Sequence, residues 1–170
     1  MGLKVIGSML IIAGCGGFGF SVAAGFRREE TALRQLIGAL DYMQCELQYR
    51  MTPLPDLCRQ AGREHPNQIG SILAELSTAM ESQLSPEVSA CVDGILRKHT
   101  SLPKRAARAF GLLGSTLGRF DAEGQLQGLE TVRAFCRGEL EEMAHNRDNR
   151  LRSYQTLGLC TGAALAILFV

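Results

Sequence analysis

An apolar run near the start of the chain constrains its fold more than any other feature. Residues Val5 to Phe26 contain no charged side chain, and 22 residues of α-helix would extend about 33 Å. That length matches the hydrocarbon core of a bilayer, which is about 30 Å thick. The sequence therefore predicts an N-terminal transmembrane helix within residues 1–26, with the polar part of the chain beginning at Arg27.

A second uncharged run covers residues 154–170, at the other end of the sequence. As a helix its 17 residues would extend about 25 Å, which is marginal for a crossing unless the bilayer thins locally. We therefore predict a short C-terminal transmembrane helix over residues 154–170. Residues 27–153 then form a separate polar domain between the two spans.

Basic residues lie on the same side of both apolar runs. Lys4 alone lies on the far side of the first run. The topology determinants are five arginines on the side of the polar domain, namely Arg27, Arg28, Arg147, Arg150 and Arg152. Because cytoplasmic flanks of membrane helices carry an excess of Lys and Arg, these arginines predict a cytoplasmic polar domain with both termini across the membrane.

The segment between the two runs shows helical periodicity throughout. Within residues 31–50, apolar residues recur at spacings of three and four, and no helix breaker separates this stretch from the first run. One continuous helix is therefore expected there, and the last long helix is expected to continue into residues 154–170. Because no stretch alternates as a strand would, we expect an all-α fold, a small antiparallel helical bundle flanked by N- and C-terminal transmembrane helices.

Glycines repeat along the helix expected over residues 104–118. Gly111, Gly114 and Gly118 are spaced by three and four residues, so they lie near one face. Since glycine lets another backbone approach closely, this spacing predicts a tight helix crossing and not a ligand site.

Cysteine usage points to a reducing compartment. The chain has six cysteines and no C-x-x-C pair. The four outside the apolar runs all fall within helical apolar patterns: Cys45, Cys58, Cys91 and Cys136. Because unpaired cysteine behaves as a small buried hydrophobe, we favour reduced core thiols over disulfides.

A search for chemistry-bearing motifs gives little. Gly14, Gly16 and Gly19 match a dinucleotide fingerprint, but a helical pattern follows them where a strand would be required. Glu142 and His145 match half of a di-iron helix motif, although the other expected helices present apolar inward faces. We therefore expect no catalytic residue, metal or cofactor, with a small helical membrane enzyme using this pair as an alternative. The formal charge of +1 gives no reason to expect nucleic-acid binding.

A lipid anchor is the main alternative for the N-terminal run. Residues from Ile12 to Cys15 fit a lipobox, and cleavage before Cys15 would leave a lipid-anchored, extracytoplasmic helical binding module. Against this, eleven more uncharged residues follow Cys15, and Arg27 and Arg28 then resemble the end of a membrane span.

The order of these segments resembles the stage III sporulation protein AB family over essentially the whole chain. The resembling segments are residues 18–20 (Phe-Gly-Phe), 33–40, 46–49, 52–55, 113–114, 117–118 with Asp121 and Gln125, and 150–158. Two features depart from the family: Gln44 stands where a glutamate is expected, and the C-terminal apolar run is short.

The resemblance implies a role that composition and periodicity do not show. Family members look like the cytoplasmic domain of type II secretion and pilus platform proteins. The implied protein is a non-catalytic adaptor of a secretion-like sporulation channel, in the mother-cell membrane facing the forespore. Its implied partners are a cytoplasmic secretion-type ATPase, other membrane subunits of the same complex and the lipid bilayer.

Overall fold

The chain folds entirely into helices within the residues that the structure describes. The computed structural model describes the backbone of residues 2–82, 87–117 and 122–169, and the side chains of residues 24–82, 87–117 and 123–146. The helices are α1 (Gly2–Arg50), α2 (Leu54–Glu64), α3 (Gln68–Glu81), α4 (Val88–Lys98), α5 (Lys104–Thr116) and α6 (Ala122–Phe169). The predicted all-α class is confirmed.

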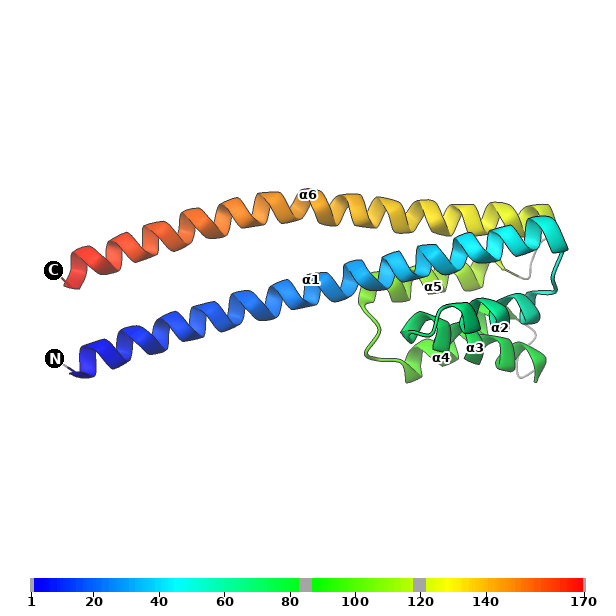
Figure 1. Cartoon of the computed structure of the whole chain (residues 1–170), viewed down its shortest axis with the longest axis horizontal. Coiled ribbons are helices and arrows are strands. Elements are labelled where there is room, and N and C mark those ends of the chain that lie inside the picture. The colour runs from blue at the N-terminus through cyan, green and yellow to red at the C-terminus, as the bar shows by residue number, and fades with distance from the viewer. Residues whose placement is uncertain (1, 83–86, 118–121, 170) are drawn as a thin grey trace.

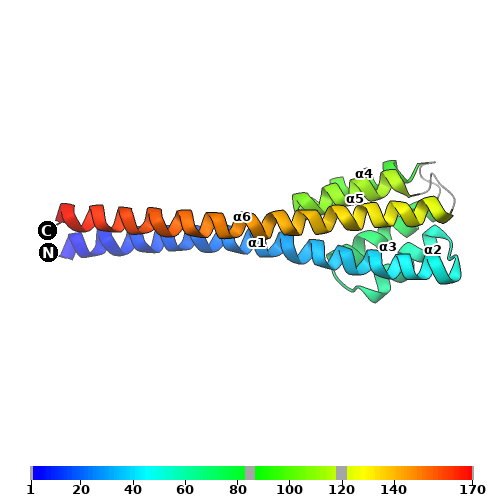
Figure 2. The ribbon, with the colours of Figure 1, turned by 90° about the horizontal axis from the view of Figure 1, so that it is seen from above.

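Two long helices dominate the shape of the molecule. Helices α1 and α6 run antiparallel and side by side along the length of the molecule, and both termini lie at the same end (Figure 1). The short helices α2 to α5 pack against the other end, and a perpendicular view shows the same arrangement (Figure 2). The fold is therefore a helical hairpin with a compact bundle at the end far from the termini.

Each long helix is continuous across the boundary between apolar run and polar domain. At 1.5 Å per residue, the 49 residues of α1 extend about 74 Å. Within the part of the chain whose side chains are described, no helix carries a stretch that could cross a membrane. The predicted spans, residues 1–26 and 154–170, lie outside that part except for residues 24–26.

Local sequence explains how the short helices begin. The Asn67 side chain caps α3, because its Oδ1 accepts hydrogen bonds from the N–H groups of Ile69 (2.9 Å) and Gly70 (3.2 Å). Helix α2 begins at Leu54, so Pro53 occupies the N-cap position without a side-chain hydrogen bond. The proline therefore precedes the first turn and keeps α2 separate from α1.

The core is built from buried apolar side chains of all six helices, and the stripe of α1 packs against α2, α3, α5 and α6. The stripe of α1 is buried, including Leu33, Leu36, Leu40 and Met43, each at most 1% exposed. Among the side chains that the structure describes, Phe110 of α5 is the largest that is fully buried. Removing one such leucine side chain costs about 2–5 kcal/mol, so these contacts hold the long helices to the bundle.

Close helix approaches occur at only some of the predicted glycines. A Cβ built on Gly114 would lie 2.9 Å from Cγ2 of Val92, so α5 approaches α4 closely at that point. A Cβ on Gly111 would meet nothing within 4 Å. Gly118 lies outside the described residues. The tightest approach involves Gly70, where a Cβ would lie 1.8 Å from the backbone oxygen of His65.

Candidate functional site

An arginine on α5 joins three helices. The Arg105 guanidinium contacts Glu29 of α1 at 3.3 Å, and Glu139 and Glu142 of α6, the latter at 3.5 Å. Its side chain is only 22% exposed and that of Glu139 only 12%. Arg105 therefore fixes how far α1 and α6 are shifted relative to each other.

The electrostatics of this cluster favour its charged form. Burial lowers the Arg105 pKa, but hydrogen bonds and charge attraction from Glu139 and Glu142 outweigh it, so the Arg105 pKa is raised. The guanidinium consequently stays protonated at every physiological pH. Its role here is structural, because its contacts are with other protein side chains.

A second arginine repeats this link nearer the bundle end. Arg133 of α6 donates to Asp41 of α1 at 2.8 Å and also binds Glu130. Gln44, where the sequence resemblance leads us to expect a glutamate, donates from Nε2 to Glu130 at 3.5 Å. A carboxylate at position 44 would instead face that of Glu130, so the amide suits this interface better.

Two large apolar side chains are exposed at the end far from the termini. Tyr49 is 78% exposed and Met51 is 77% exposed. Both lie where α1 ends, and Met51 has a positive φ of 50°, which a residue with a Cβ rarely adopts. We call Tyr49, Arg50 and Met51 the distal tip. Tyrosine and methionine are enriched in protein interfaces, so this patch is a candidate docking surface.

A small polar cluster lies beneath the distal tip. The rings of Tyr42 and His65 meet edge to face with centroids 6.4 Å apart. Burial, followed by the charges of Glu46 and Glu64, raises the Tyr42 pKa. These groups sit between α1 and α2 and help to orient the tip, since the Glu46 carboxylate also lies 3.6 Å from the guanidinium of Arg50.

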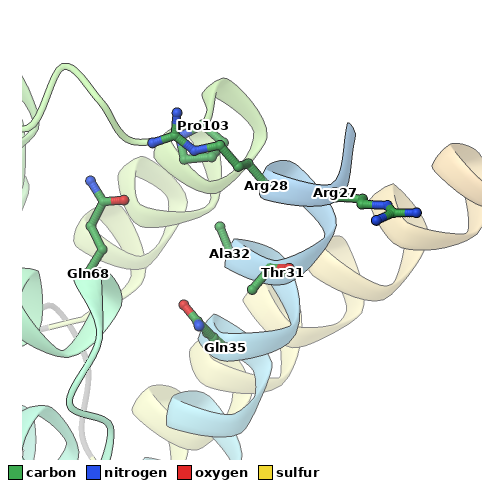
Figure 3. Close-up of a pocket in the computed structure, with 7 residues that line it drawn as sticks. All are labelled: Arg27, Arg28, Thr31, Ala32, Gln35, Gln68 and Pro103. Atoms are coloured by element: carbon green, nitrogen blue, oxygen red, sulfur yellow. The ribbon is translucent and has the colours of Figure 1, made fainter. Parts of the chain in front are cut away.

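The predicted topology arginines fall in two groups. Arg27 and Arg28 are exposed on α1 and line a cleft together with Thr31, Ala32, Gln35, Gln68 and Pro103 (Figure 3). Arg147, Arg150 and Arg152 lie on α6, and their side chains are outside those that the structure describes. The structure therefore gives side-chain surroundings only for the α1 pair.

The candidate chemical motifs do not assemble into a site. Gly14, Gly16 and Gly19 lie inside α1, so the strand-to-helix turn of a dinucleotide site is absent there. Glu142 and His145 are both exposed, and Glu142 contacts Arg105 and Asn146. Among the described side chains, no group of three His, Cys, Asp or Glu residues could hold a metal ion.

The cysteines of the polar domain are thiols. Cys58, Cys91 and Cys136 are buried and unbridged, and Cys45 is exposed. The prediction of buried core thiols is confirmed for Cys58, Cys91 and Cys136, but it is wrong for Cys45, which lies on the exposed face of α1. Burial raises the pKa of Cys58 to about 12, so its thiol is unreactive at neutral pH.

Sequence reasoning missed the two features that most define the interface between the long helices. Arg105 and Arg133 carry no local signal, because their partners on α1 are distant in the sequence. Gly70 was also overlooked, since the close contact involves a backbone oxygen in the preceding turn.

Comparisons with known proteins agree with this architecture. The family model for stage III sporulation protein AB matches residues 4–170. Stage III sporulation protein AB of Bacillus subtilis (strain 168) is 21% identical over 171 residues, covering 99% of each chain. A solved structure of stage III sporulation protein AB (SpoIIIAB) has a TM-score of 0.61 at 18% identity, covering 72% of this chain and 98% of that chain, and shows the shared fold. Because the family model spans nearly its whole length, the chain belongs to the stage III sporulation protein AB family.

Proposed function

We propose that this chain is a non-catalytic platform subunit of a secretion-like sporulation channel. In this role it is anchored in the mother-cell membrane facing the forespore and docks a cytoplasmic secretion-type ATPase to membrane partners. Family membership supports the sporulation context. The observation that carries the proposal is the hairpin of α1 and α6, which separates both termini from the bundle (Figure 1).

The register of the hairpin supports anchoring by both ends. Asp41 pairs with Arg133, and Arg105 connects Glu29 to Glu139. Continued along the two helices, this register brings Phe26 to the level of about residue 145. In this register residues 154–169 lie beside residues 2–17, so most of the two apolar runs are adjacent, as two helices crossing one bilayer would be.

The arginine flanks support the proposed orientation. In the same register, Arg152 lies roughly 10 Å nearer the termini than Arg27. Local thinning of the bilayer beside α6 would keep this residue at headgroup level. Residues 1–26 and 154–170 are thus the proposed membrane segments, and residues 27–153 the proposed cytoplasmic domain.

The distal tip is the proposed contact for the ATPase. It lies where α1 ends, at the opposite end of the hairpin from the termini (Figure 2). Tyr49 and Met51 would be buried by the ATPase, and Arg50 would lie at the edge of the contact. The outward faces of the apolar runs remain for the other membrane subunits.

Co-purification tests this proposal directly. The full-length chain, extracted in a mild detergent, is expected to retain the ATPase of its complex on an affinity column. Truncating both tip side chains, Tyr49→Ala with Met51→Ala, should reduce the retained ATPase at least tenfold. The matched control is Arg97→Ala on the exposed surface of α4. Undiminished retention by the double variant would remove the tip from the proposal, and no retention by the unmodified chain would refute ATPase docking.

A further inference from the structure

The segment that leads from α4 into α5 carries an excess of positive charge. Residues 94–117 include five Lys or Arg side chains and no Asp or Glu, in a chain whose formal charge is only +1. Arg105 is balanced by its contacts with Glu29, Glu139 and Glu142. The other four side chains are exposed, and no ion pair engages them within the described part of the chain. We call these four the basic corner: Arg97, Lys98, Lys104 and Arg108.

Helix stability accounts for only half of the basic corner. Arg97 and Lys98 occupy the last turn of α4, where cations complement the negative end of the helix dipole. Lys104 instead begins α5, whose first turn has no acid, so its charge lies at the positive end of the dipole. Arg108 follows Lys104 by four residues, and like charges at that spacing destabilise a helix. Lys104 and Arg108 therefore lower the stability of α5, which points to a role outside the fold.

The fold places this corner beside the end of the N-terminal apolar run. The Arg105 Nε lies 3.3 Å from the Glu29 carboxylate, so the first turn of α5 is level with Glu29 on α1. Phe26, the last residue of the apolar run, precedes Glu29 by three residues, or about 5 Å of helix. Both views show the start of α5 at the edge of the bundle that faces the termini (Figure 1, Figure 2). Under the proposed anchoring, the start of α5 lies within one Debye length of the hydrocarbon boundary, about 8 Å at physiological salt.

We propose that the basic corner rests on the anionic surface of the leaflet from which α1 emerges. This inference rests on the proposed membrane anchoring and adds a contact to it that the apolar runs do not make. The negative surface potential of an anionic leaflet attracts each Lys or Arg side chain held near it. An acidic protein has the same charge complementarity, but at this height the bilayer occupies the space beneath the corner. The contact fixes the tilt of the bundle, and with it the direction in which the distal tip points.

Fluorescence quenching in lipid nanodiscs tests this contact. The full-length chain, with its six cysteines replaced, carries one dye-labelled cysteine at exposed Thr100, between α4 and α5. The discs contain phosphatidylcholine alone or equal parts of phosphatidylcholine and phosphatidylglycerol, with the same trace of lipid spin-labelled on its headgroup. We expect quenching at least twofold stronger in the anionic discs, falling to the neutral level in high salt. A dye at Ser82, at the end of α3, should be quenched equally in both.

Two double variants separate the corner from total charge. Lys104→Gln with Arg108→Gln should remove the difference between the two kinds of disc. Arg50→Gln with Arg59→Gln removes the same charge far from the termini and should preserve the difference. In an uncharged detergent, the first double variant should have the same Tm as the unmodified chain or a higher one, because it removes charges that oppose the dipole of α5. A lower Tm would show that these two bases serve the fold, and would overturn the inference.

Flotation of the full-length chain with liposomes distinguishes a failure of this inference from a failure of the proposed function. A chain that does not float would refute the membrane anchoring and the surface contact together. A chain that floats, yet shows equal quenching in neutral and anionic discs, would overturn the surface contact alone and assign the basic corner to an acidic protein. Equal effects of the two double variants on quenching would likewise overturn the contact and leave the anchoring intact.

Discussion

Replacing Arg105 by alanine should loosen the hairpin from the bundle. Arg105 is the only side chain among those described that contacts acids on both long helices from α5. The Glu139 carboxylate is 12% exposed in the folded chain, and in Arg105→Ala it loses its cation. A carboxylate left unpaired in a partly buried place destabilises the folded state.

The structure sets the size of this effect. Exposed ion pairs contribute about 0–1 kcal/mol, whereas breaking a buried pair costs about 3–5 kcal/mol. Arg105 is 22% exposed and Glu142 is 59% exposed, so the cluster falls between these limits. We expect a loss of about 2 kcal/mol. For a chain of this size, that corresponds to a fall in Tm of about 4–8 °C.

Thermal unfolding followed by circular dichroism measures the loss. The full-length protein should be compared in one detergent at neutral pH. Arg34→Ala is the matched control, because its pair with Glu30 lies within one helix and its side chain is 68% exposed. That control should lower Tm by less than about 2 °C. If Arg105→Ala lowered Tm no more than Arg34→Ala, Arg105 would not link the helices and the reasoning would be refuted.

Three other expectations concern packing. In two variants that each keep one cysteine, buried Cys58 should react with a disulfide reagent at pH 8 at least a hundredfold more slowly than exposed Cys45. The reason is that burial raises the pKa of Cys58 to about 12. Similar rates for the two thiols would contradict the packing of α2. Gly70→Ala should lower the free energy of unfolding, measured with denaturant, by about 2–3 kcal/mol, because the added Cβ would collide with backbone. Gly111→Ala, where the Cβ would meet open space, should raise that free energy by about 0.5–1 kcal/mol. Equal effects of the two substitutions would count against both expectations. Met51→Gly should stabilise by about 0.5–1 kcal/mol by accommodating the positive φ, and a loss in the same assay would argue against that backbone conformation.

Elements specified by local pattern could be predicted from the sequence. The stripe of Leu33, Leu36, Leu40 and Met43 is buried as expected, because a period near 3.6 residues places apolar side chains on one helix face. The absence of a breaker before Thr31 correctly indicated that α1 is continuous. The Asn67 cap is an equally local feature, since its hydrogen bonds reach only three residues along the chain.

Features that depend on tertiary contacts could not be predicted in this way. Arg105 is an off-stripe basic residue with no sign of its partners on α1 and α6. The helix crossing was assigned to Gly111, Gly114 and Gly118 as a set, although Gly111 faces open space. Spacing selects a helix face, but only packing decides which residues on that face meet another helix. The cleft at Arg28 likewise requires α3 and α5 to be placed beside α1.

Membrane topology most directly tests the central claim, which is that the helical bundle is cytoplasmic and that both termini lie across the membrane. Single reporter cysteines should be placed at Ser82, which is exposed at the end of α3, and beside Met1, in a cysteine-free full-length chain. With an impermeant reagent on intact cells, the account predicts labelling beside Met1 and none at Ser82 until the cells are permeabilised. Labelling of Ser82 in intact cells would put the bundle outside, contradict ATPase docking, and favour the lipid-anchored alternative at Cys15.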